Sequence, residues 1–415
     1  MCGSRRNFSG LQLVIIRMKA HVPLAKRFAL AAIAALLLLY SCVRAQTTQS
    51  SAPRKIDRPL NLLVLGDSIS WGQGLKDEHK AWYLVKSWLQ QNTGREVRER
   101  IEAHSGAVIG TQNQSEPPAF SDLDGELSRA YPTIHGQLDY ALKMYADPAT
   151  VDLVIVDGCI NDLDSRRLLN AANTPDGIRE LAQAKCGAPV EALLIRITNV
   201  FPNAHVVVTG YYPILSERSA NDFFIRALAR RFYSPEVGAP KIKDKILHAR
   251  LIAISREWYH TSDQMLSAAA RKVDAELQAK GSHQRVLFAD PAFTPEQSFA
   301  ANHSRLWGFD ASALRKLLVL FTLGRVQLRA NDERRSQRDE LCKAILPPAA
   351  SESPEQKMIR EDRLLRCRLA AVGHPNRKGA AMYADAIGNL LKPLLANSGW
   401  IKDASTATTA ITPQR

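Results

Sequence analysis

The chain lacks the sequence patterns of several large functional classes. It has neither a Gly-x-x-x-x-Gly-Lys-Ser/Thr loop nor a Gly-x-Gly-x-x-Gly fingerprint, which argues against nucleotide binding. It has no Cys-x-x-Cys or His-x-x-x-His spacing, so no zinc site is expected. No basic stripe is interleaved with aromatic residues, which disfavours nucleic-acid binding. No internal repeat is visible, so a repeat architecture is not expected.

Long hydrophobic runs are also scarce, and one lies near the N-terminus. The apolar run from Phe28 to Tyr40 follows four basic residues, and Val43-Arg44-Ala45 then supplies small residues for cleavage. This order predicts a secretory signal peptide over residues 1–45 and a secreted or periplasmic protein, because the run is short for a membrane span. Cys42 leaves lipid anchoring as an alternative to simple export, although Tyr40 fits a lipobox poorly.

A strong excess of charge is missing from the mature chain. Of the 415 residues, 46% are hydrophobic and 23% are charged, which is typical of a soluble globular protein. Seven of the 55 basic residues and no acidic residue lie in residues 1–45, so the formal charge falls from +14 to +7 on cleavage. We therefore expect neither a nucleic-acid partner nor a stable membrane span after cleavage. The oligomeric state is not predicted.

Cysteine is rare, and four cysteines remain after residue 45: Cys159, Cys186, Cys342 and Cys367. An even number in an exported chain favours two disulfides, for which three connectivities exist. Pairing of near neighbours predicts the bridges Cys159–Cys186 and Cys342–Cys367. Free buried thiols are the alternative for each pair.

The rest of the chain alternates between strand and helix patterns. Residues 46–57 are expected to be a linker, residues 58–398 the folded domain, and residues 399–415 a flexible tail. Short apolar runs predict strands at 61–65, 151–157, 204–209 and 285–288, and weak alternation predicts a less buried strand at 97–104. Helical spacing separates them, which predicts an α/β fold with a mostly parallel sheet and helices on both faces. In such sheets functional residues follow the carboxyl ends of the strands.

Two long segments, 213–283 and 294–373, interrupt this alternation. The second contains an apolar stretch, Leu314–Leu328, followed by highly charged sequence. A cap over the site, a small helical subdomain and additional packed layers all remain open for both insertions.

Three of the predicted strands are followed by short motifs suited to catalysis. A Gly-Asp-Ser turn places Ser68 after the first strand, and a serine hydroxyl becomes a nucleophile once a base takes its proton. Gly106 follows the second strand, where a glycine lets a backbone N–H approach a ligand closely. Asn161, in a Gly-x-x-Asn-Asp motif, follows the third and offers a neutral amide donor. Helix N-caps at Ser68 and Asn161 and a turn at Gly106 are the alternatives.

A fourth motif, His374-Pro375-Asn376, precedes the final predicted helix. Proline in the first helical turn would fix the loop and aim the imidazole. Histidine is the usual base partner of a serine because its ordinary pKa lies near neutral pH.

In order and spacing, these motifs resemble those of the SGNH (GDSL) hydrolase superfamily over about residues 60–395. The resemblance implies a flavodoxin-like three-layer α/β/α fold and hydrolysis of carboxylic esters without metal or cofactor. It makes Ser68 the nucleophile and His374 the base. It also implies an oxyanion hole formed by the backbone N–H groups of Ser68 and Gly106 and by the side chain of Asn161.

The chain departs from that family at Ala371, which occupies the usual position of the aspartate that orients the histidine. Some relatives with a His-Pro-Asn motif use a Ser-His dyad in which a main-chain carbonyl orients the imidazole, and we adopt that interpretation. Asp290 and Asp310 are the first acids to check for a triad. A catalytically inactive relative is a further alternative.

The expected substrate is a carboxylic ester, of a lipid or of an acylated carbohydrate. The apolar stretch Leu314–Leu328 would suit an acyl pocket or lid, although an ordinary buried helix is the more usual explanation for such a stretch. The alternatives are a carbohydrate acetyl esterase and an exported binding protein without turnover. A Gly-x-Ser-x-Gly elbow is missing, which disfavours a classical α/β-hydrolase.

Overall fold

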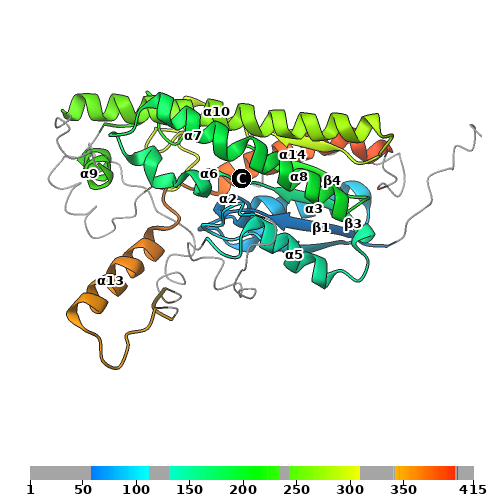
Figure 1. Cartoon of the computed structure of the whole chain (residues 1–415), viewed down its shortest axis with the longest axis horizontal. Helices are drawn as coiled ribbons and strands as arrows, with labels where there is room; N and C mark the ends of the chain where they lie inside the picture. Colours follow the sequence, from blue (N-terminus) through cyan, green and yellow to red (C-terminus); the bar gives the residue numbers. More distant parts are fainter. Residues whose placement is uncertain are drawn as a thin grey trace, which may run out of the picture. The chain divides into compact units, whose positions relative to one another are not determined.

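The structure is a computed structural model that describes residues 58–111, 130–221, 223–233, 243–308 and 346–397, with 340, 342–344 and 400 (Figure 1). All of them belong to one compact unit, Lys55–Arg415. The predicted signal peptide, the linker, Cys42, Asp310, Leu314–Leu328 and all of the predicted tail but Trp400 lie outside the described residues.

Five parallel strands form the sheet, in the order β2-β1-β3-β4-β5. The strands are β1 Leu60–Leu65, β2 Val97–Ile101, β3 Val151–Val156, β4 His205–Thr209 and β5 Val286–Ala289. This is the flavodoxin-like strand order, with the sequence reversing direction between β1 and β3. The predicted α/β sheet is therefore confirmed. Because all strands run the same way, their carboxyl ends meet at one edge.

Helices connect the strands and carry most of the remaining described residues. They are α2 Ser68–Trp71, α3 Ala81–Thr93, α5 Ile134–Met144, α6 Ile160–Leu163, α7 Pro175–Cys186, α8 Ala188–Val200, α9 Phe223–Phe232, α10 Asp244–Ala279, α13 Pro354–Leu369 and α14 Arg377–Asn397. Short 3-10 turns are η1 Asp77–His79, η2 Pro148–Thr150, η3 Ser165–Leu169 and η4 Pro295–Gln297.

Each face of the sheet is covered by its own hydrophobic core. Side chains alternate between faces along a strand, so Leu63 and Leu65 of β1 pack in one core and Leu62 and Val64 in the other. Residues of α5, α7, α8 and α10 complete the first core, and residues of α3 and α14 complete the second. All residues of β3 and β4, and all of β1 except Asn61, are buried, and cover on both faces explains their continuous apolar runs.

The first predicted insertion, 213–283, contains α9 and the long helix α10. In Figure 1, α10 is the long yellow-green helix that runs past α7. It contacts α7, α8 and β5, and its Trp258 is fully buried in the first core. Most of α10, which lies between β4 and β5 in the sequence, is therefore part of the helical layer that covers this face of the sheet.

The C-terminal boundary of the packed region reaches Trp400, two residues beyond the predicted end at 398. The Trp400 side chain is only 5% exposed, and its ring lies 5.3 Å from that of His205 at the start of β4. No helix in the described part of the chain is long and apolar enough to cross a membrane.

Both predicted cysteine pairs lie at bonding distance. Cys159 is joined to Cys186, and Cys342 is joined to Cys367. The first bridge ties the loop after β3 to the end of α7, inside the first core. The second lies in a small separate cluster with Leu364.

Removing the first bridge should destabilise the sheet. A Cys159→Ala/Cys186→Ala variant should lose about 3 kcal/mol in the free energy of unfolding, because the bridge joins residues 27 apart and restricts the unfolded chain. Urea unfolding followed by tryptophan fluorescence reports on this core, in which Trp258 is buried.

The second bridge supplies a matched control, since its cysteines are 25 residues apart. A Cys342→Ala/Cys367→Ala variant should leave the unfolding of the sheet little changed because this bridge lies in a separate cluster. Equal losses for both variants would contradict this assignment.

Candidate functional site

Ser68 and His374 are 306 positions apart in the sequence and in direct contact in the structure. The Nε2 atom of His374 lies 2.7 Å from the Oγ atom of Ser68, a hydrogen-bond distance. The Ser68 side chain belongs to the turn after β1, and His374 belongs to the loop before α14. This is the arrangement in which an imidazole can accept the proton of a serine hydroxyl.

The Ser68 turn is built by the residues on either side of it. Gly66 follows β1 with a φ of 129°, a conformation that glycine adopts readily and other residues rarely adopt. Its N–H and carbonyl are both held by the side chain of Gln137 on α5, at 2.8 and 2.9 Å. Asp67 is the N-cap of α2 and accepts a hydrogen bond from the Ile69 N–H. Ser68 is therefore not the N-cap, and its hydroxyl faces His374.

Backbone pairing holds the His374 loop. The N–H of Trp307 donates to the His374 carbonyl at 2.8 Å, and the N–H of Gly373 donates to the Trp307 carbonyl at 2.9 Å. Leu306 forms a bridge with Pro375. The second predicted insertion thus supplies a short strand-like support for the imidazole.

The expected role of Pro375 as a first-turn helix residue is wrong. Helix α14 begins at Arg377, and Asn376 caps it by accepting hydrogen bonds from the N–H groups of Lys378 and Gly379. Pro375 lies outside the helix and faces Leu306. The loop position is therefore set by long-range pairing, which the local sequence does not encode.

Gly106 and Asn161, the other two expected site residues, lie close to each other. The Asn161 Nδ2 donates to the carbonyl of Ala107, the residue after Gly106, at 2.9 Å. This bond uses one of the two amide hydrogens and orients the group. Asn161 is the second residue of α6, whose N-cap is Cys159, so the N-cap alternative for Asn161 is wrong. Gly106 has a φ of 83°, which fits a turn glycine as well as a close approach.

Ala371 provides no carboxylate beside His374. It is fully buried in an apolar cluster with Leu75, Trp307 and Ala380. Of the two acids considered as replacements, Asp290 accepts a hydrogen bond from the Ala292 N–H at 2.7 Å. Asp310 lies outside the described residues.

Two buried carboxyl groups lie beneath the Ser68 turn. Asp157, directly after β3, accepts hydrogen bonds from the N–H groups of Asp67 at 2.7 Å and Ser70 at 2.9 Å. Burial raises the pKa of Asp67 to about 6 and raises that of Asp157 well above its ordinary value, an effect to which the neighbouring Asp67 adds. No lysine or arginine in the described ranges forms an ion pair with either carboxyl.

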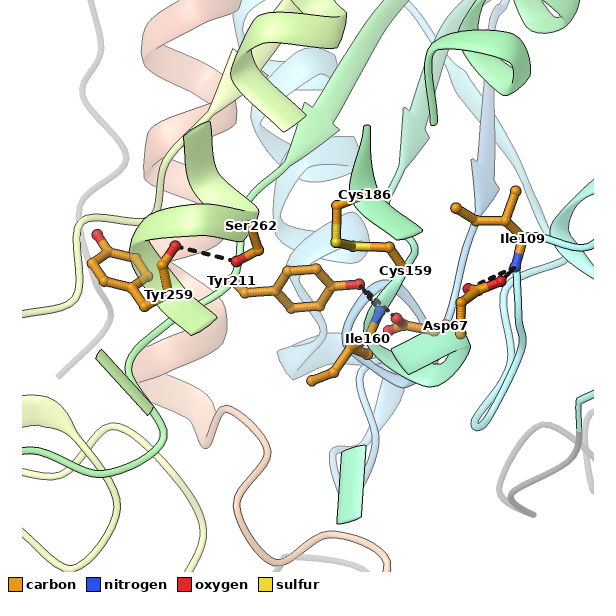
Figure 2. The surroundings of a disulfide bond; sticks show 9 residues. Asp67, Ile109, Cys159, Ile160, Cys186, Tyr211, Tyr259 and Ser262 are labelled. Carbon is orange, nitrogen blue, oxygen red and sulfur yellow. Dashed lines mark hydrogen bonds between the residues drawn. A yellow bond between two sulfur atoms is a disulfide. The ribbon is translucent and has the colours of Figure 1, made fainter. Parts of the chain in front are cut away.

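Tyr211 connects this turn to the loop after β3. Its hydroxyl donates to Asp67 Oδ2 at 2.9 Å and accepts from the Ile160 N–H at 3.3 Å, as Figure 2 shows beside the Cys159–Cys186 bridge. Tyr212 supports the other side of the site, because its hydroxyl donates to the Gly373 carbonyl at 2.9 Å.

Sequence reasoning did not find the supporting residues Asp157, Tyr211, Tyr212 and Gln137. A usable signal existed for the first three, because Asp157 ends one predicted buried strand and Tyr211 and Tyr212 follow another, at the edge where functional residues gather. Gln137 carried no such signal, since a glutamine in a helix is ordinary. Among the described residues, no group of three His, Cys, Asp or Glu side chains is arranged to hold a metal ion.

Comparisons with known proteins matched no family model and no curated protein. Similar solved structures include the extracellular lipase of Streptomyces rimosus, with 15% identity, 80% of this chain and 99% of that chain covered, and a TM-score of 0.41. The phospholipase A1 of Streptomyces albidoflavus has 12% identity, coverages of 80% and 99%, and a TM-score of 0.39. A family two carbohydrate esterase of Clostridium thermocellum has 11% identity, coverages of 85% and 67%, and a TM-score of 0.33.

The raised pKa of Asp67 should make the free energy of unfolding depend on pH. Between about pH 4 and pH 6 the native protein holds a proton that the unfolded chain has lost, so the free energy of unfolding should fall as pH rises. The slope should reach up to about 1.4 kcal/mol per pH unit for each such proton. Urea unfolding at several pH values measures it.

An Asp67→Asn variant should show a smaller slope over the same pH window. Replacement of the exposed Glu180 on α7 by glutamine is the control and should leave the slope unchanged. A slope that is the same in all three proteins would show that Asp67 does not titrate in this way.

Proposed function

We propose that this protein is an exported serine hydrolase of the SGNH type that cleaves carboxylic esters. The observation that carries the proposal is the 2.7 Å contact between Ser68 Oγ and His374 Nε2, made by two motifs far apart in the chain. A chance contact between a surface histidine and a serine needs no dedicated support. Here, in contrast, hydrogen bonds from backbone N–H groups fix the turn that carries Ser68 and the loop that carries His374.

In the first half of the reaction, His374 Nε2 takes the hydroxyl proton of Ser68 while the serine oxygen attacks the ester carbonyl. The tetrahedral intermediate then breaks its bond to the alcohol, which leaves with the proton from His374. In the second half, His374 takes a proton from water, and the resulting hydroxide attacks the acyl-enzyme. Ser68 recovers its proton as the carboxylic acid is released.

The negative oxygen of each tetrahedral intermediate needs donors that are already in place. We assign this role to the backbone N–H groups of Ser68 and Gly106 and to the side chain of Asn161. The bond from Asn161 to the Ala107 carbonyl supports the assignment, because it orients the amide beside Gly106. Asn161 remains neutral at every working pH, so its donor capacity does not titrate.

We assign His374 to a dyad in which a main-chain carbonyl orients the imidazole. Ala371 supports this assignment because its methyl side chain cannot accept a hydrogen bond and lies in an apolar cluster. The hydrogen bonds that Trp307 and Tyr212 make to the His374 loop restrict its backbone, which reduces the need for a carboxylate to hold the ring.

Export is consistent with the two disulfides. Disulfides persist in oxidising compartments and are rare where thiols are kept reduced. Both bridges join pairs of cysteines in the folded domain.

Replacing the nucleophile should abolish turnover. A Ser68→Ala variant should hydrolyse a p-nitrophenyl ester more slowly by a factor on the order of 10⁶, and a His374→Ala variant should lose a similar amount. Adding the second change to the first should cost little more, because the two groups act as a unit. The control is Ser267→Ala on α10, a serine as buried as Ser68.

A fluorophosphonate probe checks the same residue independently of the ester chosen. It should label the folded wild-type protein at Ser68 and leave the Ser68→Ala variant unlabelled. A folded wild-type protein that resists the probe and hydrolyses no ester would instead be a binding protein.

The dyad predicts that no single aspartate is essential for orienting His374. The variants Asp290→Asn and Asp310→Asn should each keep kcat close to the wild-type value. Loss of an orienting aspartate in a triad lowers kcat by about 10⁴. A loss of that size in one variant would identify its aspartate as the third member of a triad.

A further inference from the structure

The carboxyl groups of Asp67 and Asp157 are both buried beside the proposed nucleophile, where the Asp67 N–H donates to Asp157 Oδ1 at 2.7 Å. We propose that Asp157 is a neutral carboxylic acid that donates its proton to the Asp67 carboxylate, and that this one-proton pair positions Ser68 and, through Tyr211, Asn161. The inference rests on the proposed function for its catalytic consequences, but the location of the proton does not depend on it.

One of the two carboxyl groups must hold a proton at neutral pH. Both are buried, the Asp67 N–H donates to Asp157 Oδ1 at 2.7 Å, and within the described ranges no lysine or arginine is paired with either carboxyl group. Two adjacent carboxylates in such a site repel each other strongly, so one of them ionises only at a much higher pH. A pair with one proton retains a single negative charge and gains a hydrogen bond to it.

Each carboxyl group accepts two hydrogen bonds, and the difference between them is the hydroxyl donor on Asp67. Asp67 accepts the Ile69 N–H at Oδ1 and the Tyr211 hydroxyl at Oδ2, each at 2.9 Å. Asp157 accepts two backbone N–H groups, at 2.7 and 2.9 Å. The oxygen of Tyr211 already accepts the Ile160 N–H, so a proton on Asp67 Oδ2 would leave the tyrosine proton facing another donor. Hydroxyl donors form stronger hydrogen bonds with a carboxylate than with a neutral acid.

Asp157 holds the backbone on both sides of the proposed nucleophile Ser68. Asp157 accepts the N–H groups of the residues one before and two after Ser68, so it holds the turn at both ends. Gly66 is packed against the same carboxyl group, where a Cβ atom would lie 1.8 Å from Asp157 Oδ1. Any movement of Asp157 is therefore transmitted to the Ser68 hydroxyl.

Tyr211 extends the network to the oxyanion side. Its hydroxyl links Asp67, next to Ser68, to Ile160, next to Asn161. Figure 2 shows this hydroxyl between Asp67 and Ile160. The neighbours of the proposed nucleophile and of the proposed oxyanion donor are thus joined through one buried hydroxyl. We assign Asp157, Asp67 and Tyr211 as positioning residues, because none of them is assigned a contact with substrate.

Several other titratable groups face the pair. Asp162 of α6 adds negative charge near Asp67, and the phenols of Tyr211, Tyr212 and Tyr383 have a raised pKa because they are buried. His374 faces the pair through Ser68. Below the ordinary pKa range of tyrosine, the phenols remain neutral. Asp67, Asp157, Asp162 and His374 are thus the groups whose charge matters for the pH profile.

Infrared spectroscopy locates the proton without any need for turnover. At about pH 8, above the pKa of Asp67, the wild-type protein should show the carbonyl stretch of a protonated carboxylic acid. The band should disappear in Asp157→Asn and persist, shifted, in Asp67→Asn. A wild-type spectrum without the band, or its loss in Asp67→Asn alone, would overturn the proposal.

Kinetics test the positioning role. Asp157→Asn keeps the net charge, so kcat should fall by no more than about tenfold and the acid limb of the kcat/KM profile should stay in place. Asp157→Ala removes both acceptors and should lower kcat by about a hundredfold at unchanged KM, as expected for a displaced catalytic group. Asp67→Asn removes the charge, so the acid limb should move to lower pH. Tyr211→Phe should lower kcat with little effect on KM.

The control for loss of a carboxylate is Asp263→Asn on α10, outside the network, whose pKa is also raised to about 6. It should leave kcat and the pH profile unchanged. An acid limb that moves in Asp157→Asn would show that this residue is charged in the wild-type protein and would refute the proposal. If the wild-type protein hydrolyses no ester, the proposed function fails while the infrared result still decides where the proton lies.

Discussion

The backbone N–H groups of Asp67 and Ser70 both donate hydrogen bonds to the carboxyl group of Asp157, at the edge where β1 and β3 lie side by side. The carboxyl ends of parallel strands lie at the same edge of a sheet, and here the loops after β1 and β3 meet at that edge. The Ser68 hydroxyl keeps its position because the peptide groups around it are bonded to a fixed acceptor. The cost is a carboxyl group buried without a cation, which is tolerable when it holds a proton.

The same edge collects support from elements that are distant in sequence. Gln137 of α5 holds Gly66, Tyr211 after β4 holds Asp67, and Tyr212 holds the loop of His374. The rings of Tyr212 and Phe293 lie 5.2 Å apart, and the hydroxyl of Tyr383 donates to the Gly210 carbonyl. Side chains that are rigid and bonded in this way have little freedom to lose when a substrate binds, which favours a preorganised site.

Much of the architecture could be predicted because its cause is local. A continuous apolar run such as 151–156 is stable only where both faces are covered, and the observed β3 is fully buried. The predicted strand at 97–104 is longer than the observed β2, because the regular register with β1 ends at Ile101. The N–H groups of Glu102 and His104 still donate to the carbonyls of Val64 and Gly66. The pairing of neighbouring cysteines also followed from sequence distance, since short loops bring such residues together most often.

The sequence by itself determined the parallel α/β sheet, the turn that ends in Ser68 and the residue types at the strand ends, because these depend on hydrophobic period and local backbone preference. Only the tertiary structure decided that His374 touches Ser68, that residues 304–307 rather than Pro375 hold its loop, and that Asp157 lies beneath the Ser68 turn. Those contacts join segments up to 306 positions apart, and no local propensity encodes them. The turn with which Ser68 begins α2 is local, but its position relative to His374 depends on the assembled sheet and the packed final helix.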